Sequence, residues 1–70
     1  MRITYDPDVD AVYITFGDTA PFDSHDVMDG VIIDVDAGGR ILGIEVLDAR
    51  LRLGETTLAG VEFQRFDEPY

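Results

Sequence analysis

The sequence predicts a small, mainly β domain, built as an antiparallel meander of about five or six strands, with a small α+β fold as the alternative. Two observations carry this prediction. Apolar and polar residues alternate along several short segments, and turn-forming residues separate those segments. The 70 residues make one domain at most, so residues 1–70 are treated as a single small β-rich domain.

The strand signals are β-branched and aromatic residues in short runs. They cover residues 2–5, 11–16, 24–28, 31–35, 40–47 and 61–66. Pro7 with its flanking aspartates, the pair Asp29-Gly30 and the pair Gly38-Gly39 are turn signals between them. The order of strands and turns favours neighbouring segments that pair in sequence.

Residues 48–60 are ambiguous. Leu47 and Leu51 share one face of a helix, but Gly54 and two adjacent threonines weaken a long one. We expect at most one short helix, near residues 49–59.

A chain of this size needs support beyond its own core. A domain of about 60 to 70 residues buries only roughly 60% of the surface that its unfolded chain exposes. The usual supports are disulfides, a structural metal or a partner chain. The chain has no cysteine, which excludes disulfides and thiolate metal sites. Oligomerisation or a carboxylate-bound ion remains.

The apolar pattern favours oligomerisation. An antiparallel sheet commonly has one dry face and one wet face. The expected core residues are Val31, Ile33, Val35, Leu42, Ile44 and Val46. The opposite side then carries Ile32, Ile41, Leu47 and Tyr13. A second apolar face has to be covered by the C-terminal segment or by another copy, and we expect a homodimer.

The charge is strongly acidic, with 15 Asp and Glu residues against 5 arginines and a net charge of -10. Such a surface repels nucleic acid and anionic membranes, so neither is an expected partner. A basic protein or a cation fits better, although the same acids could simply keep a small domain soluble. Without a bilayer-length apolar run or a signal-peptide pattern, we expect a cytoplasmic protein.

Residues 34–45 can be interpreted in two ways. Asp34, Asp36, Gly39 and Glu45 match positions one, three, six and twelve of an EF-hand calcium loop. An EF-hand needs a helix on each side, but the flanking Val-Ile-Ile and Val-Leu segments have strand propensity. The two adjacent glycines can adopt the positive φ angles of a tight turn. We therefore interpret the segment as a β-hairpin.

A second acidic cluster consists of Asp6, Asp8 and Asp10. Three carboxylates could hold Mg²⁺ or Ca²⁺, although turn formation also explains aspartates at these positions. The alternative hypothesis for the chain is thus a divalent-cation-binding protein, in which this cluster meets Asp34 or Asp36 across the sheet. No cofactor is expected.

Ser24, His25 and the neighbouring Asp23 or Asp26 are the residues that could form a nucleophile with its base. Adjacent residues of a strand point to opposite faces, so Ser24 and His25 are not expected to meet. We predict that the chain is not an enzyme.

Four segments resemble a family of small prokaryotic proteins, the domain-of-unknown-function family numbered 2283. They are Ile3–Pro7, Asp10–Ile14, Asp29–Asp34 and Asp36–Ala49. The resemblance covers roughly residues 2–49 and implies a compact β-rich domain with no established activity or catalytic residues. Family members are often encoded beside small proteins that look like toxin nucleases, which implies an antitoxin-like role. The leading hypothesis is a non-enzymatic protein-interaction module, dimeric and directed towards a basic partner.

Overall fold

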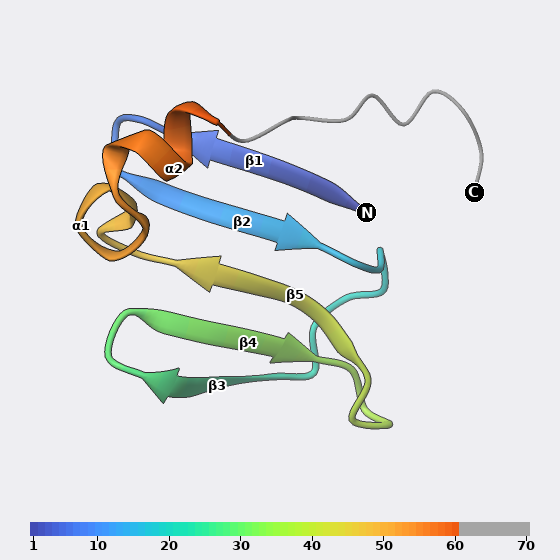
Figure 1. The fold of residues 1–70 in the computed structure, drawn as a ribbon. Helices are drawn as coiled ribbons and strands as arrows, with labels where there is room; N and C mark the ends of the chain where they lie inside the picture. Colours follow the sequence, from blue (N-terminus) through green and yellow to red (C-terminus); the bar gives the residue numbers. More distant parts are fainter. Residues whose placement is uncertain (61–70) are drawn as a thin grey trace.

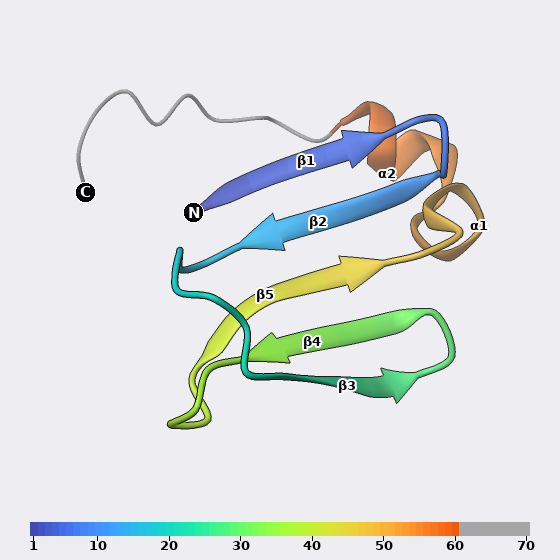
Figure 2. The same ribbon diagram turned by 180° about the vertical axis from the view of Figure 1, so that it is seen from behind.

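The computed structural model describes residues 1–60, which form one five-stranded antiparallel sheet and two short helices (Figures 1 and 2). The elements are β1 (Arg2–Asp6), β2 (Ala11–Thr15), β3 (Asp23–Met28), β4 (Val31–Val35), β5 (Ile41–Val46), α1 (Ala49–Leu53) and α2 (Glu55–Ala59). The mainly β fold with some α+β character is confirmed. The strand expected at residues 61–66 lies outside the described residues.

The strand order is β1-β2-β5-β4-β3, which differs from a simple meander at one connection. After β2 the chain crosses to the far edge of the sheet, and β3, β4 and β5 then return until β5 pairs with β2 (Figure 1). This order places β5, which contains the buried Leu42 and Gly43, between two partners. It leaves the polar β3 at an edge, where exposed side chains carry no burial cost.

The hairpin interpretation of residues 34–45 is confirmed, because β4 and β5 pair with each other. Within the connecting turn, the Asp36 amide donates to the Arg40 carbonyl at 3.0 Å, and the Gly39 amide donates to the Asp36 carbonyl at 3.0 Å. Only Gly39 of the two glycines has a positive φ, at 84°. A side chain at that position would be strained, which explains the glycine.

The helical region contains two short helices instead of at most one. Gly54 separates α1 from α2 with a φ of 86°, a conformation that ends the first helix. Its amide still donates to the Arg50 carbonyl at 2.9 Å. The same glycine that weakens the sequence signal for one helix therefore produces the corner between two.

One face of the sheet is almost entirely apolar, and we call it the apolar face. Directly paired residues share a face, which places Ile3 and Ile14, Val12 and Val46, and Ile33 and Ile44 together there. The opposite face carries Tyr13 and Ile32, as expected. Glu45, which pairs with both, interrupts the apolar surface there.

The helices cover only one end of the apolar face (Figures 1 and 2). The buried residues at this end include Val12, 4% exposed, and Ala49, the first residue of α1, which is fully buried. By contrast, every residue of β4 is half-buried and every residue of β3 is exposed. No large side chain of residues 1–60 is fully buried. Residues 1–60 thus cover the expected core face only in part.

Candidate functional site

A polar network crosses the face opposite the apolar face. The Tyr13 hydroxyl on β2 donates to Asp34 Oδ2 on β4 at 2.7 Å, and the Ser24 hydroxyl on β3 donates to Asp34 Oδ1 at 2.6 Å. One carboxylate therefore joins three strands, and Tyr13 spans the intervening strand β5 to reach it. From the sequence, Asp34 is a candidate metal ligand, Ser24 a candidate nucleophile, and Tyr13 only a member of the second apolar face; the structure joins all three in one network.

Gly43 makes this network possible. It lies in β5 between Thr15 on one side and Asp34 on the other. A Cβ atom at this position would collide with the Tyr13 hydroxyl, would lie 2.6 Å from Tyr13 Cζ, and would approach the Ile14 carbonyl to 3.0 Å. Tyr13 can cross β5 only because that strand has no side chain there. A glycine inside a strand signals such close approach.

The network changes the acidity of both of its titratable groups. The hydrogen bond to Asp34, together with burial and the Asp34 and Glu45 charges, raises the pKa of Tyr13 to about 12. The hydrogen bonds from Ser24 and then Tyr13 lower the pKa of Asp34, against the opposing effect of burial. The phenol therefore stays protonated and the carboxylate stays ionised around neutral pH.

Asp6, Asp8 and Asp10 do not point to a common centre. Asp6 Oδ1 accepts a hydrogen bond from the Asp8 amide at 2.9 Å, which closes the turn between β1 and β2. Asp10 instead binds groups from two other elements. Turn formation thus accounts for the Asp6 carboxylate, whereas Asp10 has a different role.

Asp10 fastens the start of α1 to the sheet. Its Oδ1 accepts hydrogen bonds from the Tyr5 hydroxyl at 2.8 Å and from the Arg50 amide at 3.2 Å. Its carbonyl accepts the Ala49 amide at 2.9 Å. The residue has a φ of 55°, a conformation that aspartate tolerates better than most residues. Asp10 is an evident acidic residue in the sequence, but its partner Arg50 lies 40 residues away in the chain, so only the fold reveals that contact.

The five acidic residues considered for a cation lie in separate places. Asp6, Asp8 and Asp10 belong to the turn after β1, whereas Asp36 lies in the turn between β4 and β5, at the opposite end of the sheet (Figure 1). The Asp36 carboxylate accepts the Gly38 and Arg40 amides at 2.9 Å. Within residues 1–60, no three histidine or acidic side chains are grouped so as to hold a metal ion.

Ser24 and His25 point to opposite faces of β3. Ser24 is bonded to Asp34, whereas His25 pairs with Ile33 of the apolar face in the strand register. The His25 Nε2 atom lies 3.5 Å from Asp23 Oδ2, and both side chains are more than half exposed, at 60% and 56%. An exposed pair of this kind contributes little to stability.

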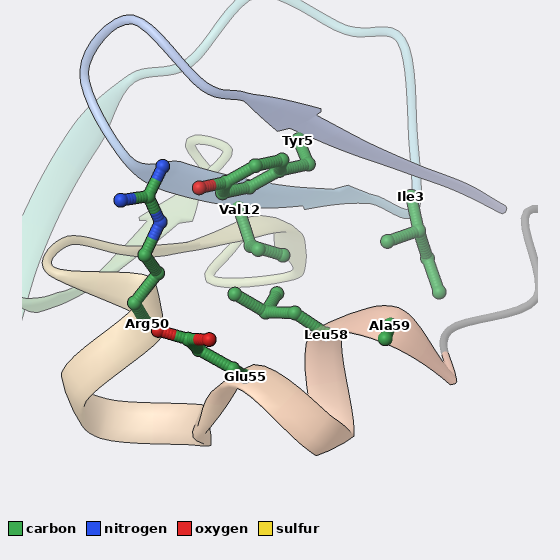
Figure 3. Close-up of a pocket in the computed structure, with 7 residues that line it drawn as sticks. All are labelled: Ile3, Tyr5, Val12, Arg50, Glu55, Leu58 and Ala59. Carbon is green, nitrogen blue, oxygen red and sulfur yellow. The ribbon is translucent and has the colours of Figure 1, made fainter.

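A cavity of about 430 Å³ lies between α2 and the sheet (Figure 3). Leu58 points from α2 towards Val12, and the Arg50 side chain extends towards Tyr5 (Figure 3). The other lining residues are Ile3, Glu55 and Ala59. The hydrogen bond with Tyr5 and the charges of Tyr5, Asp10 and Glu55 raise the pKa of Arg50, one of the residues that line this cavity.

The open half of the sheet, β3 and β4, combines apolar and acidic side chains. Phe22, Val27 and Met28 are more than half exposed, at 72%, 54% and 57%. The exposed aspartates Asp23 and Asp26 lie in the same strand. An apolar surface bordered by charge is the usual composition of a protein-binding surface.

These features define a small acidic β-sheet domain with a half-covered apolar face and a polar network across its other face. The chain belongs to the family described as protein of unknown function (DUF2283), whose model matches residues 2–50. No curated protein and no solved structure matches the chain. Within residues 1–60 there is no helix long and apolar enough to cross a membrane.

Proposed function

We propose that the chain is a non-enzymatic protein-interaction module that binds a basic protein through the open half of its sheet. The observation that carries this proposal is the incomplete cover of the apolar face. Both helices lie at the other end, so β4 stays half-buried and β3 stays exposed. Burying this surface against a partner would remove apolar area from water, which is the main driving force of most protein association.

The charge distribution supports a basic partner. Asp23, Asp26 and Asp29 follow one another along and just after β3. Within residues 1–60, Arg52 reaches Asp29 at 4.0 Å and His25 lies 3.5 Å from Asp23. With a net charge of -10, the chain attracts cations over a distance and accelerates the encounter with a basic protein. The apolar residues beside these aspartates then supply affinity.

β3 also offers an edge for strand addition. It is the last strand of the sheet on its side, and it pairs only with β4 among the described residues. A strand from a partner could extend the sheet by main-chain hydrogen bonds, while alternate side chains contact its apolar face. Basic side chains on that strand would meet Asp23 or Asp26.

The chemistry of the polar network supports binding over catalysis. A general base works best with a pKa near the operating pH, and a general acid needs a proton to give. The pKa of Asp34 is lowered and that of Tyr13 is raised to about 12, so both are shifted away from neutral pH. The network is thus suited to holding strands together.

The role that fits this binding best is antitoxin-like: a cytoplasmic acidic domain that neutralises a basic toxin nuclease by covering its nucleic-acid-binding surface. The acidic open half would compete with the phosphate backbone for the same basic side chains. Cation binding by the acidic turns is not favoured, because their carboxylates already accept backbone or side-chain hydrogen bonds in different parts of the fold.

A binding experiment with matched variants tests the proposal. The full chain is titrated with the purified product of the adjacent gene at low and moderate salt. Replacing Asp23 and Asp26 by Asn should weaken the complex about ten-fold and reduce its salt dependence, because attractive charges at the interface are lost. The control replaces Asp8 and Asp18, two exposed aspartates elsewhere, by Asn and changes the net charge equally.

The two double variants separate position from overall charge. Equal weakening in both would show that only the net charge matters, and would contradict a binding surface at β3. Absence of any complex with the wild-type chain at low salt would contradict the proposal as a whole.

A further inference from the structure

β1 is the second edge strand of the sheet that residues 1–60 form. β1 stands at the end of the strand order, and within residues 1–60 it pairs only with β2. Its exposure alternates, with Arg2, Thr4 and Asp6 exposed and the two residues between them half-buried. An edge strand that is neither covered nor blunted by like charges is a template for pairing with another chain.

The sequence of β1 is complementary to itself. In an antiparallel pair of two β1 strands centred on Thr4, Arg2 of each copy lies opposite Asp6 of the other. Ile3 of each copy then lies opposite Tyr5 of the other, and the two Thr4 residues face each other. Opposite charges, an aliphatic residue facing an aromatic one, and paired threonines are the cross-strand combinations that stabilise a sheet.

We propose that a second copy of this chain binds at β1, so that two sheets join edge to edge around a two-fold axis at Thr4. The pairing is isologous, as closed symmetric dimers require. It forms without charge repulsion at its centre, because each β1 contributes one cation and one anion. This surface lies at the opposite edge from the open half, so the proposal does not rest on the basic partner.

The other edge strand, β3, is less suited than β1 to pairing with a second copy. The charged residues of β3 are Asp23 and Asp26, with no arginine among the six residues of the strand. In a two-fold pairing of two β3 strands these aspartates would have no arginine opposite them, unlike Asp6 of β1. β1 therefore offers a second copy a charge complementarity that β3 lacks.

Pairing at β1 would also extend the apolar surface under the helices. Ile3 and Tyr5 line the cavity beside α2 and lie on the apolar face (Figure 3). A two-fold axis perpendicular to the sheet keeps this face on the same side in both copies, so the two cavities adjoin. The open halves would then lie at the far ends of a ten-stranded sheet, twice the five strands of one copy, and both would stay accessible.

Charge reversal in the full chain tests this arrangement. Arg2→Asp places two carboxylates opposite each other, and Asp6→Arg places two guanidinium groups opposite each other. Each variant alone should weaken the dimer at least about ten-fold in sedimentation equilibrium, because like charges face each other twice per dimer. In a mixed dimer of the two variants, the introduced aspartate at position 2 faces the introduced arginine at position 6, and the native Asp6 faces the native Arg2. Opposite charges are thus paired again, and the mixed dimer should form with nearly wild-type affinity.

Controls separate this result from effects of net charge or folding. Arg40→Asp and Asp18→Arg change the net charge by the same amounts at exposed positions outside β1 and its turn, and both should dimerise like the wild type. Circular dichroism of every variant confirms that the sheet is intact, and the mixing result itself requires folded chains.

Three outcomes overturn the proposal. The wild-type chain could be monomeric at all concentrations, as expected if another segment of the same chain occupies the β1 edge. The dimer could be insensitive to both charge reversals, which would place it at another surface such as the apolar face. The two variants could fail to associate when mixed, although both are folded.

Discussion

The two ends of the sheet are built from similar strands but differ in what covers them. At the β1–β2 end, two short helices lie over the apolar face, and Asp10 ties the first of them to the sheet through Tyr5 and Arg50. At the β3–β4 end, no helix of residues 1–60 lies over the two strands, and no residue of either strand is buried. The comparison indicates that stability is concentrated at the covered half, whereas the open half is available for a partner.

β5 connects the two halves of the sheet. Substitution of Gly43 within this strand is expected to lower stability more than any other change described below. Gly43→Ala should cost about 3 kcal/mol, because the new methyl group displaces Tyr13 and presses on the Ile14 carbonyl. Chemical denaturation measures the loss. In a Tyr13→Ser background the same substitution should cost clearly less, since the ring that it displaces is gone. Equal costs in both backgrounds would show that Tyr13 does not account for the requirement for glycine.

Two valines provide a direct comparison of the halves. Val12 and Val31 both pair with Val46, one from each side, but Val12 is 4% exposed and Val31 is half-buried. Val12→Ala should lower the free energy of unfolding by about 2 kcal/mol, and Val31→Ala by less than about 1 kcal/mol. If both substitutions cost the same in denaturant melts, the open half would be as well packed as the covered half.

The attachment of α1 depends on one carboxylate. Asp10→Ala removes the acceptor of the Tyr5 hydroxyl and of the Arg50 amide, and should destabilise the chain by about 1.5 kcal/mol. The neighbouring Asp8→Ala should change stability by less than about 0.5 kcal/mol, because Asp8 is exposed. Thermal unfolding of the two variants compares them directly. A similar effect of both would reduce Asp10 to one of several interchangeable turn residues.

The polar network makes stability depend on pH at the alkaline end. The pKa of Tyr13 is raised from 10.0 to about 12, so the folded chain holds this proton more tightly than the unfolded chain does. The contribution of the protonated Tyr13 to stability is complete below pH 10 and is lost as the pH rises towards about 12. Tyr13→Phe should lower the free energy of unfolding by about 1 kcal/mol at neutral pH. It should also reduce the loss of stability at alkaline pH.

The same variant also tests how stability depends on pH at the acid end. The pKa of Asp34 is lowered in the folded chain, so its contribution is present above its ordinary pKa and disappears as the pH falls through the lower folded value. Tyr13→Phe leaves Ser24 as the remaining hydrogen-bond donor and should reduce the acid dependence. Denaturant melts over a pH series measure both limbs. An unchanged alkaline limb would exclude Tyr13 as its source.

The strands and the hairpin were predictable because their signals are local. Alternation, the β-branched residues and the glycine turn together identify β4 and β5, and they exclude the helices that an EF-hand would need. The strand order was not predictable in the same way. Nothing in residues 16–22 specifies that the chain crosses to the far edge, since that choice follows from the burial of β5 between two partners.

The functional residues were predictable by type but not by partner. Asp10 and Asp34 were recognised as candidate ligands, yet each has hydrogen-bond partners that are distant in sequence. Tyr13 and Gly43 were missed, although a glycine inside a strand is itself a signal of close approach. The faces of Tyr13 and Ile32 were predicted correctly from alternation, but the sequence does not show that the helices cover only one end of the expected core face.

Backbone hydrogen exchange of the full chain, with and without the purified product of the adjacent gene as the proposed basic partner, is the most direct test of binding at the open half. Binding there predicts that the partner slows exchange in β3 and β4 and leaves the amides of β1 and β2 unchanged. Slowing confined to β1, β2 and the helices would contradict it, because the partner would then bind the half of the sheet that the chain already covers itself.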